Sequence, residues 1–360
     1  MNKPTFISVV LLWFSTFALA AQGDPYDYWK RLPRGVNMAS KNPVADFEAL
    51  RGYGGTLVRF GATGRPADFT FLVKGSGDNE AFDLSPANLA KVKDLAKSME
   101  EKNLRLIISL ADIPGRRWEF RKRDCRIWDN KKFQDGFVMA WEAIANALKG
   151  SENIAGYDLI NEPYLPAALV CKGYRGTIDD LISLYKRTVE AIRKIDVRTP
   201  IILESPEMAS AHTITQLPVY PASSRVIYSF HYYEPFSYFS ARENGGKLTY
   251  PGLIPSSSGK QIFWDIGRHR QQLAPVIQWQ RENSIESYRI FVGEFGVWRK
   301  AQGAQSYLQD LTKLFNEQGW PWAYYSFRED EWDNTDLEKE GKIPGRRPTD
   351  LFRTIQTQFR

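Results

Sequence analysis

Short apolar runs recur along the chain and alternate with longer amphipathic segments. Each run has the length of a buried strand, and most are rich in β-branched or aromatic residues. There are eight such runs, at residues 35–38, 56–60, 105–110, 154–160, 200–203, 226–230, 289–292 and 322–326. Strands that alternate with helices predict a parallel sheet that the helices cover.

The segments between the runs place apolar residues at steps of three and four, which is typical of a helix packed on a core. In residues 130–148, for example, Phe133, Phe137 and Trp141 fall on one face. The predicted helices cover residues 44–51, 86–102, 130–148, 178–195, 267–283, 304–317 and 349–358. Eight strands with about eight helices predict an α/β fold, a single-domain (β/α)8 TIM barrel with long loops after its strands.

An open doubly wound sheet is the alternative fold, but the first run lacks the glycine-rich phosphate turn that such sheets often carry. The longest connections follow the third, fourth and sixth runs, at residues 111–129, 163–176 and 234–266. Active sites of barrels are built from the loops that follow the strands. We therefore expect the functional residues at these strand ends.

The N-terminus has the pattern of an export signal. Lys3 precedes an apolar stretch at residues 6–19, and Ala18-Leu19-Ala20 matches a cleavage site. The prediction is a signal peptide at residues 1–20 and a catalytic domain at 21–360. After cleavage, the catalytic domain is expected to be periplasmic or secreted, without stable membrane insertion. An uncleaved anchor is the alternative.

Composition narrows the chemistry. The chain has 360 residues, 48 Lys and Arg against 42 Asp and Glu, three His and two Cys. These counts leave little room for a histidine-rich metal site and exclude a four-cysteine zinc site, so we expect neither a metal nor an organic cofactor. Cys125 and Cys171 could pair in an oxidising compartment, or they could be two separate buried thiols.

Polar residues appear abruptly where the predicted strands end. The fourth run leads into Asn161-Glu162-Pro163, and the seventh is followed by Gly293-Glu294-Phe295-Gly296. A charge directly after an apolar strand is costly unless it has a partner or a use. Two carboxylates on strands three apart can face each other across a barrel mouth, which is the arrangement that cleavage of a glycosidic bond requires.

These two motifs, in this order on alternating β/α units, resemble glycoside hydrolase family 5, the cellulase family of retaining barrel glycosidases. The similarity extends from about Arg34 to Arg353 and includes Asn37 in the first run. It implies that Glu162 is the general acid/base and Glu294 the nucleophile. The resemblance further implies that Asn161 bonds the sugar 2-hydroxyl. It implies that Arg59 and Tyr233 each bond the nucleophile carboxylate and that His231 lies beside it.

The chain also departs from the family pattern. Members often carry a His after the third strand, where this chain has Asp112, which could bind a substrate hydroxyl or cap the loop. They usually present a Trp at the eighth strand, where Tyr325 or Phe327 stands here. Trp298, just past Glu294, is a further candidate for stacking on a sugar. These departures concern the identity of the sugar rather than the carboxylate chemistry.

Residues 115–126 carry six basic residues against two acidic ones, interleaved with Trp118 and Phe120. Such a run could bind nucleic acid, meet an anionic polysaccharide, or be a solvated loop. Export and the paired carboxylates argue against a nucleic-acid partner. The loop at residues 234–266 is rich in aromatic rings, which suit either a sugar-binding cleft or the core of a lid.

The predicted function is an exported, monomeric, endo-acting retaining β-glycanase that hydrolyses a β-1,4-glucan without a cofactor. Its partner is then a polysaccharide or an oligosaccharide. The alternatives are activity on mannan, β-1,3-glucan or an acidic bacterial exopolysaccharide, and a non-catalytic polysaccharide-binding protein on the same scaffold.

Overall fold

A computed structural model describes residues 24–38, 43–61, 69–116, 124–164, 176–256, 258–329, 332, 334–339 and 345–359. Eight parallel strands close into a barrel in the spatial order β1-β12-β11-β8-β7-β6-β5-β2. The strands are β1 (Arg34–Met38), β2 (Leu57–Phe60), β5 (Arg105–Ser109), β6 (Ile154–Asp158), β7 (Ile201–Glu204), β8 (Val226–Tyr232), β11 (Ile290–Phe295) and β12 (Trp322–Tyr324). All eight predicted strands are confirmed, as is the barrel.

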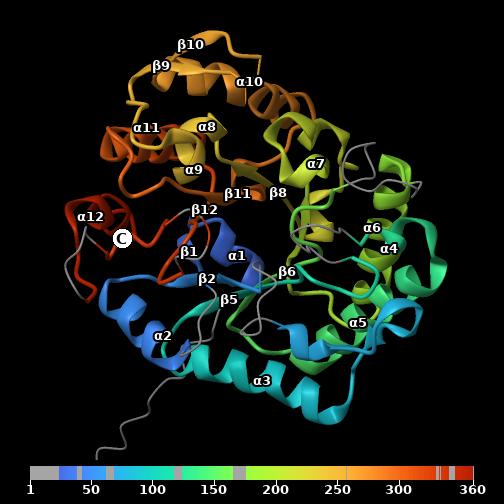
Figure 1. Cartoon of the computed structure of the whole chain (residues 1–360). Coiled ribbons are helices and arrows are strands. Elements are labelled where there is room, and N and C mark those ends of the chain that lie inside the picture. Colours follow the sequence, from blue (N-terminus) through green and yellow to red (C-terminus); the bar gives the residue numbers. More distant parts are fainter. Residues whose placement is uncertain are drawn as a thin grey trace, which may run out of the picture.

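The predicted helices surround the barrel, with α3 and α10 on opposite sides (Figure 1). They are α2 (Pro43–Gly52), α3 (Pro86–Glu100), α5 (Lys131–Leu148), α6 (Ile178–Arg193), α10 (Ile266–Glu282), α11 (Ala304–Gln318) and α12 (Asp350–Gln356). The apolar stripe of α5 is buried as predicted. In the fully described segment 205–225, the helical pieces are short: α7 (Pro206–Ala209), η3 (Ala211–Gln216) and η4 (Ala222–Ser224).

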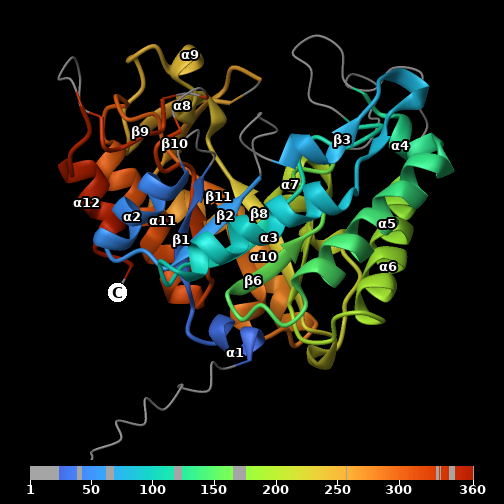
Figure 2. The same cartoon turned by 90° about the horizontal axis from the view of Figure 1, so that it is seen from below.

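The amino-terminal half of the barrel interior is apolar. Leu57, Ile107 and Ile202 belong to one buried cluster that fills it. Helix α1 (Pro25–Trp29) closes this end, and the buried indole of Trp29 donates to the carbonyl of Ala155 at 2.8 Å. Figure 2 shows α1 at the end of the barrel opposite to the hairpin β9–β10. This end of the barrel therefore serves stability rather than ligand binding.

Two residues further along the same strands, the barrel interior becomes polar. Side chains two apart in a strand point to the same face. Arg59 follows Leu57 in this way, and Glu204 follows Ile202. Both polar side chains are fully buried. The carboxyl ends of the strands thus hold a buried polar layer above an apolar floor.

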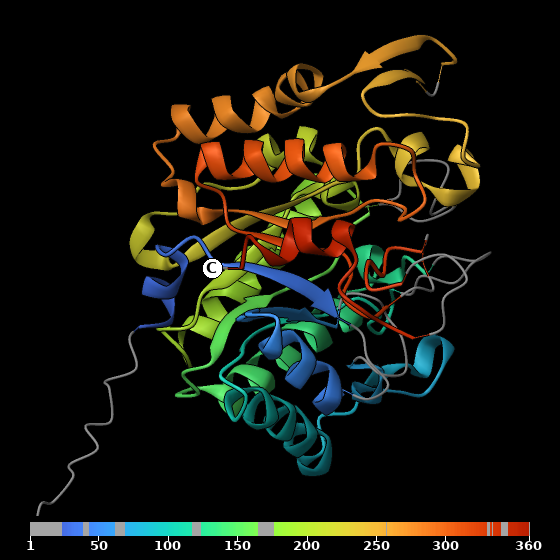
Figure 3. The same cartoon turned by 90° about the vertical axis from the view of Figure 1, so that its left-hand side faces the viewer.

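Small elements decorate the face to which the strands point (Figure 3). The predicted loop at 234–266 contains two short helices and a hairpin: α8 (Phe236–Phe239), α9 (Ala241–Asn244), β9 (Gly252–Pro255) and β10 (Gln261–Trp264). A second hairpin and further short pieces on this face are β3 (Val73–Lys74), β4 (Ala81–Phe82), α4 (Arg126–Asp129), η1 (Phe69–Leu72) and η2 (Gly77–Asn79). The turn η5 (Ser287–Arg289) lies at the other end of the barrel, directly before β11. Such elements of two to four residues are too short to leave a periodic signal.

The predicted signal peptide at residues 1–20 lies outside the described residues. Among the helices that the structure describes, none combines the length and the apolar character that a membrane crossing requires.

Candidate active site

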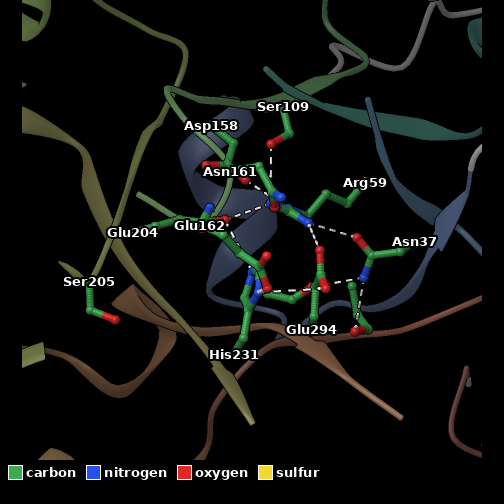
Figure 4. A network of polar contacts seen from close by, with 12 residues as sticks. Asn37, Arg59, Ser109, Asp158, Asn161, Glu162, Glu204, Ser205, His231 and Glu294 are labelled. Atoms are coloured by element: carbon green, nitrogen blue, oxygen red, sulfur yellow. Dashed lines mark hydrogen bonds and ion pairs between the residues drawn. The ribbon is translucent and has the colours of Figure 1, made fainter. Parts of the chain in front are cut away.

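Arg59 lies at the centre of a fully buried ionic network at the carboxyl ends of the strands (Figure 4). Its guanidinium donates to three carboxylates, those of Asp158 at 2.7 Å, Glu204 at 2.5 Å and Glu294 at 2.6 Å. It also donates to the side-chain oxygens of Asn37, Ser109 and Asn161. Burial opposes the charge, but the three carboxylates raise the pKa of Arg59 above its ordinary value. Arg59 therefore remains a cation.

A change of register in β11 brings Glu294 opposite His231 of β8. The change falls at Gly293, where a Cβ atom would lie 2.5 Å from the Ser229 hydroxyl and 3.1 Å from the His231 ring. Glycine is therefore required for this close approach. Glu294 receives hydrogen bonds on both oxygens, from Arg59 and from the Tyr233 hydroxyl at 2.7 Å. Burial raises the pKa of Glu294, while the charges of His231 and Arg59 act against that rise.

Glu162 stands just after β6, in a left-handed backbone conformation with φ of 48°. This region is disfavoured for residues other than glycine, so neighbouring groups must hold it. Arg116 donates to the carbonyls of Asn161 and Glu162, each at 2.6 Å, and Glu204 accepts the Glu162 N–H at 2.6 Å. The Glu162 side chain is about one-fifth exposed, so a ligand can reach it.

The two candidate carboxylates face each other. One oxygen of Glu162 and one of Glu294 lie within 4.8 Å of each other and of a ring nitrogen of His231. Figure 4 shows the three side chains converging from three different segments. Retaining glycosidases hold their carboxyl groups about 5–5.5 Å apart, whereas inverting enzymes need about 6.5–9.5 Å to admit a water molecule. The separation matches the retaining class.

His231 connects the two carboxylates to a third. Its Nδ1 lies 3.0 Å from Glu162 Oε1 and 3.5 Å from Glu294 Oε2, and its Nε2 lies 3.2 Å from Glu204 Oε1. Burial lowers the pKa of the imidazole, but the Glu204 and Glu294 charges outweigh it and raise that pKa to about 10. Burial opposes ionisation of Glu204 as well, but His231 and Arg59 lower its pKa below the ordinary value. In Asp158, burial and the adjacent Glu204 raise the pKa.

The structure brings together the six residues named for the site, namely Arg59, Asn161, Glu162, His231, Tyr233 and Glu294. Asp112 is half-buried in the segment after β5, and Trp298 is half-buried against the core. Trp118 lies outside the described residues.

The two stacking candidates after β12 differ in position. Tyr325 is 5% exposed, and its hydroxyl donates to Glu329 at 2.8 Å. The proposal of Phe327 as a sugar platform is wrong. Its ring is 2% exposed and packs between Tyr53 and Phe352, which belong to the outer helical layer. The chain turns away from the barrel mouth after Tyr325, and the sequence pattern does not reveal that turn.

An aromatic wall stands beside the nucleophile instead. We use this name for Tyr233, Phe239 and Trp332, whose ring centroids lie 4.5–5.0 Å apart. Phe236, which is 43% exposed, continues the wall outward at 5.8 Å from Phe239. Trp332 was not selected from the sequence because it lies eight residues beyond the end of β12.

The basic run after β5 is only partly described. The solvated-loop alternative is wrong for its two described arginines. Arg116 is 3% exposed and binds main-chain carbonyls, and Arg126 pairs with Asp124 and Glu80. Cys125 is fully buried and disulfide-bonded. Cys171 lies outside the described residues, so the pairing of the two remains a prediction.

Several residues of the network were missed as functional candidates: Asn37, Ser109, Arg116, Asp158 and Glu204. Glu204 carried the same signal as the two candidate carboxylates, since it follows an apolar run directly. The predicted strand ended one residue before it. Asp158 and Ser109 lie within predicted strands. There, a residue of the network differs from any other strand residue only in that its side chain points into the barrel.

Glu162, His231 and Glu294 are also the described residues that could hold a metal ion, judged by the separation of their ligand atoms. Glu294 is already bonded to Arg59 and Tyr233. Hydrogen bonds among the side chains themselves therefore account for the close approach of these three residues.

A closed (β/α)8 barrel with two facing carboxylates at the carboxyl ends of its strands defines a glycoside hydrolase of the barrel type. The family model of cellulase (glycosyl hydrolase family 5) matches residues 46–331. The chain belongs to this family.

Cellodextrinase A of Ruminococcus flavefaciens is 24% identical over 258 residues, which cover 71% of this chain and 70% of the relative. Solved structures share the fold. Cel5A of Thermotoga maritima in complex with cellobiose has 18% identity and a TM-score of 0.67, with 92% of this chain and 100% of that chain covered. Its complex with mannotriose has 17% identity, a TM-score of 0.67 and the same coverage.

Proposed function

We propose that this glycoside hydrolase is an endo-acting, retaining β-1,4-glucanase in which Glu294 is the nucleophile and Glu162 the general acid/base. The observation that carries this proposal is the pair of facing carboxylates within 4.8 Å, which differ in their surroundings. Glu294 is almost fully buried and receives bonds from Arg59 and Tyr233, whereas Glu162 is partly open to solvent. One group is held as an anion, and the other can exchange a proton with a leaving group or with water.

In the first step, an oxygen of Glu294 attacks the anomeric carbon and the bond to the glycosidic oxygen breaks. Glu162 gives its proton to that oxygen, so the leaving chain departs as an alcohol and Glu162 becomes a carboxylate. In the second step, Glu162 takes a proton from water, and the oxygen of the water displaces Glu294 from the anomeric carbon. The proton returns to Glu162, Glu294 is again a carboxylate, and the β-configuration is restored.

The surroundings support roles for three neighbouring residues. Arg59 and Tyr233 stabilise the departing carboxylate of Glu294 through the bonds they already make. The Asn161 side-chain oxygen accepts from Arg59, which orients its amide group toward the space that the sugar 2-hydroxyl would occupy. Contacts to that hydroxyl strengthen in the transition state of retaining glycosidases.

Two observations support the choice of a β-1,4-glucan. The relatives include a cellodextrinase, and one structural neighbour is named as an endo-β-1,4-glucanase. The aromatic wall leads outward from the nucleophile to Phe236, as in a cleft that stacks several sugar rings. A β-mannan is the second candidate, favoured by the structural neighbour that was solved with mannotriose.

Export is part of the proposal. It is supported by the apolar stretch at 6–19 with its Ala18-Leu19-Ala20 site and by the disulfide-bonded state of Cys125. Expression of the full chain with its native N-terminus in a bacterial host tests it. The mature protein in the periplasm or medium should begin at residue 21. Retention of the intact chain in the cytoplasm would contradict export.

Activity is tested by release of reducing ends from β-1,4-glucan, β-1,3-glucan, mannan and an acidic exopolysaccharide. We expect the highest rate on β-1,4-glucan, with oligosaccharides of several lengths as early products. Glu294→Ala and Glu162→Ala should each lower kcat by at least about 10³-fold, consistent with loss of covalent and proton-transfer catalysis. Glu243→Ala, an exposed position on α9, is the matched control and should keep wild-type activity.

Azide distinguishes the two roles when the substrate carries a good leaving group. Azide that replaces the Glu294 side chain attacks from the nucleophile side and gives an α-glycosyl azide. Azide that replaces Glu162 attacks the glycosyl-enzyme and gives a β-glycosyl azide. The opposite pairing of variants and products would overturn the assignment.

A further inference from the structure

A third carboxylate lies behind the two that face the cleft. Glu204, the last residue of β7, is fully buried, so it does not reach a sugar in the cleft. Nevertheless, it contacts both halves of the proposed catalytic pair. Its Oε2 accepts the main-chain N–H of Glu162 at 2.6 Å, and its Oε1 lies 3.2 Å from His231 Nε2.

The contact with the ring decides which nitrogen of His231 carries a hydrogen. An ionised Glu204 is an acceptor only, so Nε2 must donate to it. Nδ1 then faces Glu162 Oε1 at 3.0 Å, and a single proton can lie on either atom of that pair. The imidazole becomes the partner with which Glu162 shares its proton.

The contact with the main chain acts on the same residue. Glu162 has φ of 48°, which a glutamate adopts only when its surroundings hold it. Glu204 holds the N–H side of this residue, and Arg116 holds its carbonyl. The position of the Glu162 side chain therefore depends on both neighbours.

We propose that Glu204 is a positioning residue of the acid/base. Its carboxylate fixes His231 with Nε2 protonated and holds the strained main chain of Glu162, so that His231 Nδ1 and Glu162 share one proton at the cleft. This inference rests on the proposed role of Glu162.

The charges around the shared proton set the direction of the expected effect. His231 faces Glu162 on the loop after β6, Glu204 on β7 and Glu294 on β11, and Arg59 on β2 binds the last two. A negative charge on Glu204 favours the protonated state of the His231–Glu162 pair. Consistent with this, Glu204 is the principal group that raises the pKa of His231. Removal of the charge should weaken proton binding by His231, and with it the hold on the shared proton.

The test is the pH profile of kcat for Glu204→Gln, Glu204→Asp and a matched control. Glu338→Gln removes another buried carboxylate, which pairs with Arg328 at 2.7 Å in the loop after β12. For Glu204→Gln we expect the alkaline limb to move to lower pH by at least about one unit and kcat to fall at least about 10-fold, with KM within about threefold. Glu204→Asp should restore the alkaline limb in part. Glu338→Gln should keep the wild-type profile.

A spectroscopic measurement keeps the proposal testable if Glu204→Gln does not fold. The chain has three histidines, so nitrogen chemical shifts of the labelled full-length protein resolve each imidazole. In the wild type, His231 should bear its hydrogen on Nε2 and titrate above the ordinary histidine pKa. A wild-type His231 with Nε2 unprotonated at neutral pH, or an unmoved alkaline limb in a folded Glu204→Gln variant, would overturn the inference.

Failure of the proposed function would look different. In that case the wild type would release no sugar, or Glu162→Ala would stay active, whatever the state of His231.

Discussion

Replacement of Tyr233 by phenylalanine isolates one hydrogen bond to the proposed nucleophile. The Tyr233 hydroxyl donates to Glu294 Oε2 at 2.7 Å, and Glu294 is only 3% exposed. Burial keeps the pKa of Tyr233 well above its ordinary value, so the phenol stays protonated and acts as a donor. The phenylalanine ring keeps the contacts with Phe239 and Trp332. The substitution thus removes a bond and leaves the packing in place.

A buried hydrogen bond to a charged group contributes about 1.5–3 kcal/mol. Because the phenol bonds the ionised form of Glu294, its loss should raise the pKa of that carboxyl by about one to two units, at 1.36 kcal/mol per unit. The proposed reaction needs Glu294 as an anion. The acidic limb of the pH profile of kcat/KM should therefore move to higher pH by the same amount.

The assay is initial-rate hydrolysis of a soluble β-1,4-glucan from pH 3 to pH 9, with thermal unfolding recorded for each variant. Tyr238→Phe is the matched control, since the buried Tyr238 also loses a hydroxyl, one that donates to the carbonyl of Gln302 at 2.8 Å. An acidic limb that stays in place or moves to lower pH in Tyr233→Phe would refute the reasoning. An equal shift in Tyr238→Phe would show that the shift does not arise from the bond to Glu294.

Three further perturbations test the network and the core. Arg59→Met leaves three buried carboxylates without their cation. It should therefore lower the free energy of unfolding by about 3–5 kcal/mol and abolish hydrolysis. A wild-type denaturation midpoint would contradict the role of the network. Trp141→Ala removes a fully buried indole of α5 and should cost about 3–5 kcal/mol by chemical denaturation, and a loss below 1 kcal/mol would show that this helix face is not part of the core. The pKa of His231 is raised to about 10, so its stabilising effect is complete below about pH 6.5 and is lost as pH rises through 10. The unfolding temperature of the wild type should therefore fall as pH rises from 7 to 10, and this fall should be smaller in His231→Gln. An equal fall in both proteins would contradict the raised pKa of His231.

Regular strands and helices were predictable because the pattern of apolar residues repeats with their own periods. The apolar runs that became β2 and β8 begin within one residue of the observed strands. Small elements were not predictable, because a hairpin such as β9–β10 has strands of four residues at the surface. Its position depends on packing that no local pattern records.

The site was predictable where a charge follows an apolar run. Glu162 and Glu294 were identified in this way, and Glu204 escaped because its predicted strand was one residue too short. The burial of Arg116 could not be predicted, because its partners are main-chain carbonyls that any sequence provides. None of the three alternatives left open for this loop foresaw that one of its arginines supports the backbone of the proposed acid/base.

The most direct test of the central claim is to trap the covalent intermediate. The enzyme is incubated with a 2-deoxy-2-fluoro cellobioside that carries a good leaving group. The fluorine slows both the formation and the hydrolysis of the glycosyl-enzyme, and the good leaving group makes its formation fast again, so the covalent intermediate accumulates. Peptide mass spectrometry should then find one fluorosugar on the peptide that contains Glu294, and Glu294→Gln should remain unlabelled. Absence of an adduct in an enzyme that turns over the parent substrate, or an adduct on Glu162, would contradict the account.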